Sequence, residues 1–313
     1  MVIRMELLCY DCPRRCGARR SETLSGGVCQ SPLLPRVIRA APHFGEEPCI
    51  SGSRGAGTVF FTGCSLRCVY CQNAEISRKG VGKALRPDEL REVMLRLCDK
   101  GVHNIELVTP SHFTRVIAEA LSGAELGIPV VWNSSGYECA ETLRMLEGLI
   151  QVYMPDLKTL NPETAKRYSA APDYPEQAKE ALQEMFRQRG AYRLGEDGML
   201  QSGVLIRHLI LPGRTEESRD VIDYVAESFP QGSVLFSLMS QYTPMAPNAR
   251  FPELSGTVSR EENENLIHYM KVRRLTDGYW QEITSAGKEN IPLFDGTGLG
   301  VLTDSGSSRF PQA

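Results

Sequence analysis

The chain contains 313 residues, 42% of them hydrophobic, and its 35 Lys and Arg against 38 Asp and Glu give a formal net charge of -3. This length allows one large domain with a small appendage. No segment concentrates Lys and Arg as a phosphate-binding surface would, and no apolar run is long enough to cross a membrane. Met1 to Met5 also lack the apolar core of a signal peptide. From these three observations together we expect a cytoplasmic protein without nucleic-acid or membrane partners.

Four cysteines open the chain in a segment with little periodic structure: Cys9, Cys12, Cys16 and Cys29. Four thiolates so close in sequence can close a tetrahedral metal site, and metal binding would supply folding energy that the segment lacks in apolar residues. Zinc and an auxiliary iron-sulfur cluster both accept four cysteines, so the identity of this second metal is left open. A Gly- and Pro-rich linker follows; its Glu46 and Glu47 could reach a site at this edge, but we interpret them as a solvated pair.

Three further cysteines lie on one loop, directly after an apolar run that begins at Thr58. Cys64, Cys68 and Cys71 stand at positions i, i+4 and i+7. Soft thiolates on a tight loop suit iron and sulfur. A [4Fe-4S] cluster has four iron corners, so three cysteines would leave one iron open to another ligand. The alternative is a structural zinc site, which needs a fourth protein ligand, and no other cysteine stands close by on the C-terminal side.

From Thr58 onward the sequence alternates short β-rich runs with amphipathic helical stretches. Six strand and helix units in series predict a parallel sheet with helices outside it. The predicted strands are residues 58–62, 104–109, 129–133, 149–154, 204–211 and 233–239. Because the carboxyl ends of parallel strands open on one face, the polar segments after these strands should meet the cysteine loop at a common rim.

The cysteine spacing, with Tyr70 before the third cysteine, resembles the signature of the radical S-adenosylmethionine (radical SAM) superfamily. The resemblance implies an α/β fold, a partial (β/α)6 TIM-like barrel of the radical SAM type, with a small N-terminal cysteine-rich segment. It also implies that Cys64, Cys68 and Cys71 hold a [4Fe-4S] cluster whose open iron is chelated by the amino and carboxylate groups of SAM. In that superfamily the reduced cluster cleaves SAM to a 5′-deoxyadenosyl radical.

A narrower resemblance is carried by later segments. Two segments, Asp156 to Lys158 and Ile206 to Gly213, look like segments of pyruvate formate-lyase activating enzymes. The runs from Tyr153 to Lys158 and from Lys166 to Pro175, with the four-cysteine opening, are more similar to PflX-like homologues of those enzymes. The chain departs from the activases after the second strand. There it has Thr109-Pro-Ser-His112 in place of a Gly-Gly-Glu-like turn, and hydroxyls such as that of Thr109 could replace the contacts to the amino end of SAM.

Short polar side chains near the strand ends are candidates for holding SAM. Tyr70 and Asn73 could contact the adenosine, although Tyr70 could equally serve packing. Asn133, Ser134 and Ser135 carry hydrogen-bonding groups suited to the ribose or the methionine moiety. The same residue types also favour helix caps, so both roles are open.

Charged residues near the later strand ends form a second group of candidates. Asp156 and Lys158 point to the same side of an extended segment; they could hold the substrate or the SAM carboxylate, or form a surface ion pair. Arg207 lies inside an apolar strand and should have a carboxylate partner, for which SAM is one candidate. Strand alternation turns its neighbour His208 outward to a structural role. His112 is the better candidate for chemistry, but we assign no catalytic residue.

We predict three segments: a cysteine-rich metal-binding segment with a linker over 1–50, the radical SAM partial barrel over 51–245, and a C-terminal helix with a wrapping tail over 246–313 that is disordered from Ser305. The predicted activity is reductive SAM cleavage for hydrogen abstraction, with an electron donor such as flavodoxin or ferredoxin. By resemblance the target is a glycyl-radical enzyme, with a peptide or small molecule as alternatives. The competing class is a non-catalytic metal-binding module.

Overall fold

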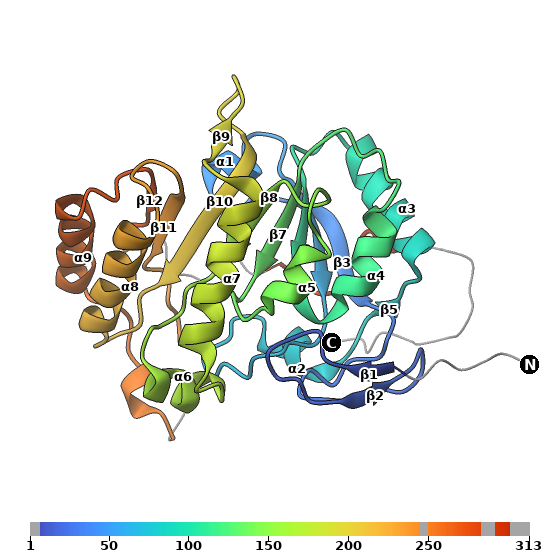
Figure 1. Ribbon diagram of the computed structural model, residues 1–313, viewed down its shortest axis with the longest axis horizontal. Coiled ribbons are helices and arrows are strands. Elements are labelled where there is room, and N and C mark those ends of the chain that lie inside the picture. The colour runs from blue at the N-terminus through green and yellow to red at the C-terminus, as the bar shows by residue number, and fades with distance from the viewer. Residues whose placement is uncertain (1–6, 245–249, 283–291, 301–313) are drawn as a thin grey trace, which may run out of the picture.

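The computed structural model describes residues 7–244, 250–282 and 292–300 (Figure 1). The predicted disordered tail from Ser305 lies outside these residues. Within the described part of the chain, ten strands form one sheet in the order β12-β11-β10-β8-β7-β6-β4-β3-β5, with β9 (Arg193–Leu194) paired to β10. A separate pair of strands, β1 (Leu7–Cys9) and β2 (Ala18–Arg20), forms a small antiparallel sheet near the N-terminus.

The predicted strands form the parallel core of the sheet. They pair in chain order, each with the next along the sequence, as expected for successive strand and helix units. Their side chains are largely buried because helices or loops cover both faces of the sheet. The predicted partial barrel is therefore confirmed. These strands are β4 (Ala56–Phe61), β6 (Ile105–Val108), β7 (Val130–Ser134), β8 (Val152–Pro155), β10 (Leu200–Leu209) and β11 (Leu235–Met239).

Amphipathic helices cover one face of the sheet in Figure 1. Helix α3 begins at Pro87, and the backbone N–H of the preceding residue, Arg86, donates to the Glu89 side chain at 2.8 Å. Helix α9 begins with a capping box formed by Ser259 and Glu262. None of the helices in the described residues has an apolar stretch long enough for a bilayer. The helices are α1 (Pro48–Ser51), α2 (Ala74–Lys79), α3 (Pro87–Asp99), α4 (Thr114–Leu121), α5 (Ala140–Arg144), α6 (Pro162–Ser169), α7 (Tyr174–Arg189), α8 (Thr215–Ser228) and α9 (Arg260–Val272), with short 3-10 turns at Ser111–Phe113 and Pro252–Leu254.

Strands outside the predicted set extend the sheet at both edges. At one edge, β12 (Gly278–Trp280) pairs in parallel with β11. At the other, β3 (Arg36–His43) runs antiparallel to β4 and also pairs with the two-residue β5 (Lys83–Ala84). Residues 292–300 run along β3, because the Ala40 N–H donates to Thr297 at 2.9 Å and the Gly296 N–H donates to Ile38 at 3.0 Å. Each of the three predicted segments thus contributes residues to an edge of this sheet.

Candidate active site at the strand ends

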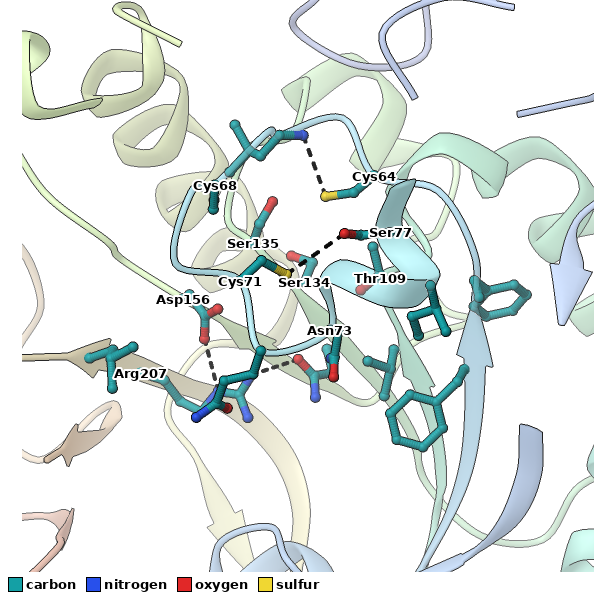
Figure 2. Close-up of a pocket in the computed structure, with 18 of the residues that line it drawn as sticks. Cys64, Cys68, Cys71, Asn73, Ser77, Thr109, Ser134, Ser135, Asp156 and Arg207 are labelled. Atoms are coloured by element: carbon teal, nitrogen blue, oxygen red, sulfur yellow. Dashed lines mark hydrogen bonds and ion pairs between the residues drawn. The ribbon is translucent and has the colours of Figure 1, made fainter. Parts of the chain in front are cut away.

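A cavity of about 230 Å³ lies at the carboxyl ends of the parallel strands (Figure 2). The loop cysteines and every residue predicted to contact SAM are among the residues that line it. They are Cys64, Cys68, Tyr70, Cys71, Asn73, Thr109, Asn133, Ser134, Ser135, Asp156, Lys158 and Arg207. The strand ends therefore converge as the parallel topology predicts. The contacts of these residues with a cofactor remain predictions.

The cysteine loop leaves β4 through a glycine turn and is held on its outer side by the end of α6. Gly63 has a φ of +83°, which favours glycine, and the Val69 N–H donates to the Tyr168 carbonyl at 2.8 Å. Burial, with the neighbouring thiols of Cys68 and Cys71, raises the pKa of Cys64 far above its ordinary value. A cation or metal that favours the thiolate is needed before such a group ionises near neutral pH.

The donor set of this loop fits the group that the sequence implies. Three soft thiols share one cavity wall, and donors stand beside each sulfur. The Leu66 N–H lies 3.4 Å from Cys64 Sγ, and a serine hydroxyl accompanies each of the other two sulfurs. Hydrogen-bond donors around thiolates are typical of iron-sulfur sites.

Arg207 joins three residues on the cavity floor. Its guanidinium donates to Asp156 Oδ1 at 3.0 Å, to Glu46 Oε2 at 2.9 Å and to Asn133 Oδ1 at 2.7 Å. Lys158 Nζ donates to the other oxygen of Asp156 at 2.8 Å. Burial opposes ionisation of Asp156, but the charges of Lys158 and Arg207 outweigh it and lower its pKa. The expected carboxylate partner of Arg207 is confirmed, and the ion pair of Asp156 and Lys158 lies in the cavity wall instead of on the surface.

Three carboxylates lie at or behind this part of the cavity wall, and Glu106 among them was not predicted. Glu46 is not solvated, as the linker composition had suggested, because its side chain is 14% exposed and contacts Arg207. Glu47 is also not a solvated partner, since its Oε2 is buried without a hydrogen bond among the described residues. Glu106 is fully buried in β6, where it accepts from the Thr58 hydroxyl at 2.8 Å and from the Asn133 amide at 2.6 Å. The sequence could have marked Glu106 as a candidate site residue, because it is a charged residue inside an apolar strand, as Arg207 is.

The two histidines considered in the sequence serve the scaffold. His208 lies on the outer side of the sheet, where its ring contacts the Leu157 carbonyl at 2.7 Å and Ser218 Oγ of α8 at 2.9 Å, as expected. His112 is turned away from the cavity and its Nε2 lies 2.9 Å from the Thr62 carbonyl. Burial lowers the pKa of His112 to about 3, so the ring stays neutral. His112 is thus not among the residues that line the cavity, and a part for it in the chemistry stays a prediction.

The four N-terminal cysteines lie apart from the cavity wall. Cys9, Cys12 and Cys29 are buried and Cys16 is exposed. Burial, with the thiols of Cys29, Cys9 and Cys139 nearby, raises the pKa of Cys12 to about 12. Within the described residues, no three His, Cys, Asp or Glu side chains are gathered as ready ligands for a single ion, and this holds for the loop cysteines as well as for the N-terminal ones. A second metal held by these cysteines stays a prediction.

Comparisons with known proteins identify the family of the chain. A radical SAM superfamily model matches residues 58–225, more than half of the chain. An uncharacterized protein of Methanocaldococcus jannaschii is 28% identical over 271 residues, which are 83% of this chain and 73% of that protein.

Solved structures give weaker likenesses. SuiB of Streptococcus suis is 15% identical with a TM-score of 0.49, covering 71% of this chain and 47% of SuiB, so the chain spans about half of SuiB. A domain of a pyruvate-formate lyase-activating enzyme from Bacteroides vulgatus is 13% identical with a TM-score of 0.34, covering 63% of this chain and 91% of that domain.

The superfamily match begins in β4, passes through the cysteine loop and ends in α8, so it spans the strands that build most of the cavity. The chain belongs to the radical SAM superfamily.

Proposed function

We propose that this chain cleaves SAM reductively and directs the resulting 5′-deoxyadenosyl radical to abstract hydrogen from a target. The observation that carries the proposal is the shared cavity, whose wall brings the three loop thiols together with the polar residues of the later strand ends. A [4Fe-4S] cluster bound by Cys64, Cys68 and Cys71 would supply the electron for SAM cleavage. An external one-electron donor, such as flavodoxin or ferredoxin, would restore it.

The remaining wall residues would bind and orient SAM. The Asn133 side chain is held at both ends, by Arg207 and by Glu106, so its position in the wall is fixed. Fixed polar groups bind a ligand without a further ordering cost. Thr109 has a φ of +60°, a strained conformation for a β-branched residue, and it stands where activases have their Gly-Gly-Glu-like turn. We assign Thr109 to the amino end of SAM, and Asn73 and Ser135 to its nucleoside and methionine parts.

Contacts around α6 and α7 support a place among the PflX-like homologues of activating enzymes. The Tyr174 hydroxyl contacts the carbonyls of Asp156 at 2.8 Å and Ser135 at 2.9 Å. Tyr168 and Ser169 contact the cysteine loop through their carbonyls. The segments that carry the narrower resemblance therefore meet at the cavity. By the resemblance that these segments carry, a glycyl-radical enzyme is the proposed target, with modification of a peptide or small molecule as the alternative.

Anaerobic reconstitution with iron and sulfide tests the proposal. After addition of dithionite and SAM, we expect 5′-deoxyadenosine from the wild type and from Cys98→Ala, a matched control whose cysteine lies in α3 outside the site. Cys64→Ala should yield none. A fully loaded wild type that makes no 5′-deoxyadenosine, or a Cys64→Ala variant that does, would overturn it. A protein that binds only zinc would favour the metal-binding module.

A further inference from the structure

The last turn of α6 lies against the middle of the cysteine loop. The Tyr168 carbonyl accepts from the Val69 N–H at 2.8 Å, and the Ser169 carbonyl accepts from the Arg67 N–H at 3.4 Å. At the same place, Ser169 Oγ lies 3.2 Å from Cys68 Sγ. Ser169 is 4% exposed and Cys68 is 9% exposed, so this contact is shielded from solvent.

The position of the Ser169 hydroxyl is fixed by the backbone on either side of it. Helix α6 ends at Ser169, and Ala170 adopts a left-handed conformation that turns the chain toward α7. Arg14 reaches in from the N-terminal segment and donates to the carbonyls of Ser169 and Ala170. A thiolate has no proton to donate, so once Cys68 is ionised the serine must be the donor of this hydrogen bond.

The three loop sulfurs differ in their donors. Cys68 has the shortest contact, from a buried hydroxyl. Cys71 Sγ lies 3.8 Å from Ser77 Oγ, a longer contact drawn in Figure 2. Cys64 Sγ lies 3.4 Å from a backbone N–H, which a side-chain substitution does not remove. Cys68 is therefore the sulfur whose surroundings depend most on one replaceable hydroxyl.

We propose that Ser169 is a positioning residue that donates a hydrogen bond to Cys68 Sγ and raises the reduction potential of the cluster. The inference rests on the proposed function, because Cys68 must be a cluster ligand. A cluster that gains one electron carries more negative charge on its sulfurs, so a donor stabilises the reduced form more than the oxidised form. Loss of the hydroxyl should then make reduction by any one-electron donor harder.

The test is a redox titration of the full-length, anaerobically loaded protein, followed by electron paramagnetic resonance. In Ser169→Ala we expect the equilibrium constant for one-electron reduction to fall about tenfold, a midpoint shift of about 59 mV to more negative potential. Ser77→Ala should shift it less, in the same direction. Ser218→Ala is the matched control: its buried hydroxyl contacts His208, outside the cavity, and it should leave the potential unchanged.

Iron and sulfide analysis separates failure of this inference from failure of the proposed function. If the wild type binds no cluster, the proposed function fails. If Ser169→Ala binds the cluster with an unchanged potential, the role of Ser169 is overturned. If Ser169→Ala binds no cluster, Ser169→Thr is measured instead, because threonine keeps the hydroxyl. A wild-type reduction potential in Ser169→Thr supports the inference. A potential as low as that expected for Ser169→Ala contradicts it.

Discussion

Two regions of the chain carry clustered cysteines, and only one of them faces the cavity. The loop of Cys64, Cys68 and Cys71 follows a strand of the parallel sheet, so the topology delivers it to the mouth of the barrel. The N-terminal cysteines lie in and around the small sheet of β1 and β2, away from the cavity wall. Both regions are rich in closely spaced cysteines. The strand that precedes the loop, more than the spacing itself, decides which thiols can meet a substrate.

The two regions nevertheless touch. Arg67 of the loop donates to the Val28 carbonyl at 2.8 Å, and Arg14 of the N-terminal segment donates to the Ser65 carbonyl at 2.8 Å. The N-terminal segment is therefore packed onto the loop that is proposed to bind the cluster. Variants can show how far one depends on the other.

The largest effect should come from replacing one cysteine in each of the two regions. Cys68→Ala removes a ligand of the proposed cluster, so we expect complete loss of 5′-deoxyadenosine formation. Cys12→Ser should remove any metal of the N-terminal segment while the loop still binds iron and SAM is still cleaved. Metal analysis beside the product assay checks both. Loss of SAM cleavage in Cys12→Ser, with the loop cluster present, would show that the N-terminal site takes part in the reaction.

Gly63→Ala tests the packing between the two regions. A Cβ at this position would lie 2.2 Å from Ser31 Oγ and 2.8 Å from the Cys29 carbonyl, at a φ of +83°. We expect a loss of about 2–4 kcal/mol in the free energy of unfolding, measured with urea. Gly101→Ala is the matched control, because Gly101 has a φ of +76° but open space around it. Equal losses in the two variants would mean that the added Cβ finds room, which would contradict the close packing of the two regions at Gly63.

A further effect, smaller for each pH unit than the loss expected for Gly63→Ala, concerns Glu106 behind the cavity wall, outside both cysteine regions. Burial, with the charge of Glu46, raises the pKa of Glu106 well above its ordinary value of 4.5. The folded protein therefore holds a proton that the unfolded chain releases, and this group lowers stability as the pH rises above 4.5, by up to about 1.4 kcal/mol per pH unit. Glu106→Gln should remove this slope, whereas Glu119→Gln, exposed on α4, should keep it. Unfolding curves between pH 5 and 8 measure it, and an unchanged slope in Glu106→Gln would contradict the assignment.

The sequence predicted the parallel strands because each is a short apolar run followed by polar residues. The same rule placed Asn133 and Asp156 at one cavity, and the charge of Arg207 inside an apolar strand was a separate signal. It could not place Glu46, which precedes the first parallel strand. This residue reaches Arg207 only because β3 pairs antiparallel with β4, and such long-range pairing leaves no local pattern. The direction of the His112 ring could not be predicted for a related reason, since a 3-10 turn after β6 points it toward Thr62.

The course of residues 292–300 along β3 has a consequence for the synthesis of the chain. Pro292 lines the cavity, and a Cβ at Gly298 would lie 1.6 Å from the Ala40 carbonyl, so this late segment fits closely against an early strand. Until it emerges from the ribosome, that side of β3 has unpaired backbone groups and can pair with another chain. A chain cut short before residue 292 should therefore aggregate instead of forming a smaller enzyme.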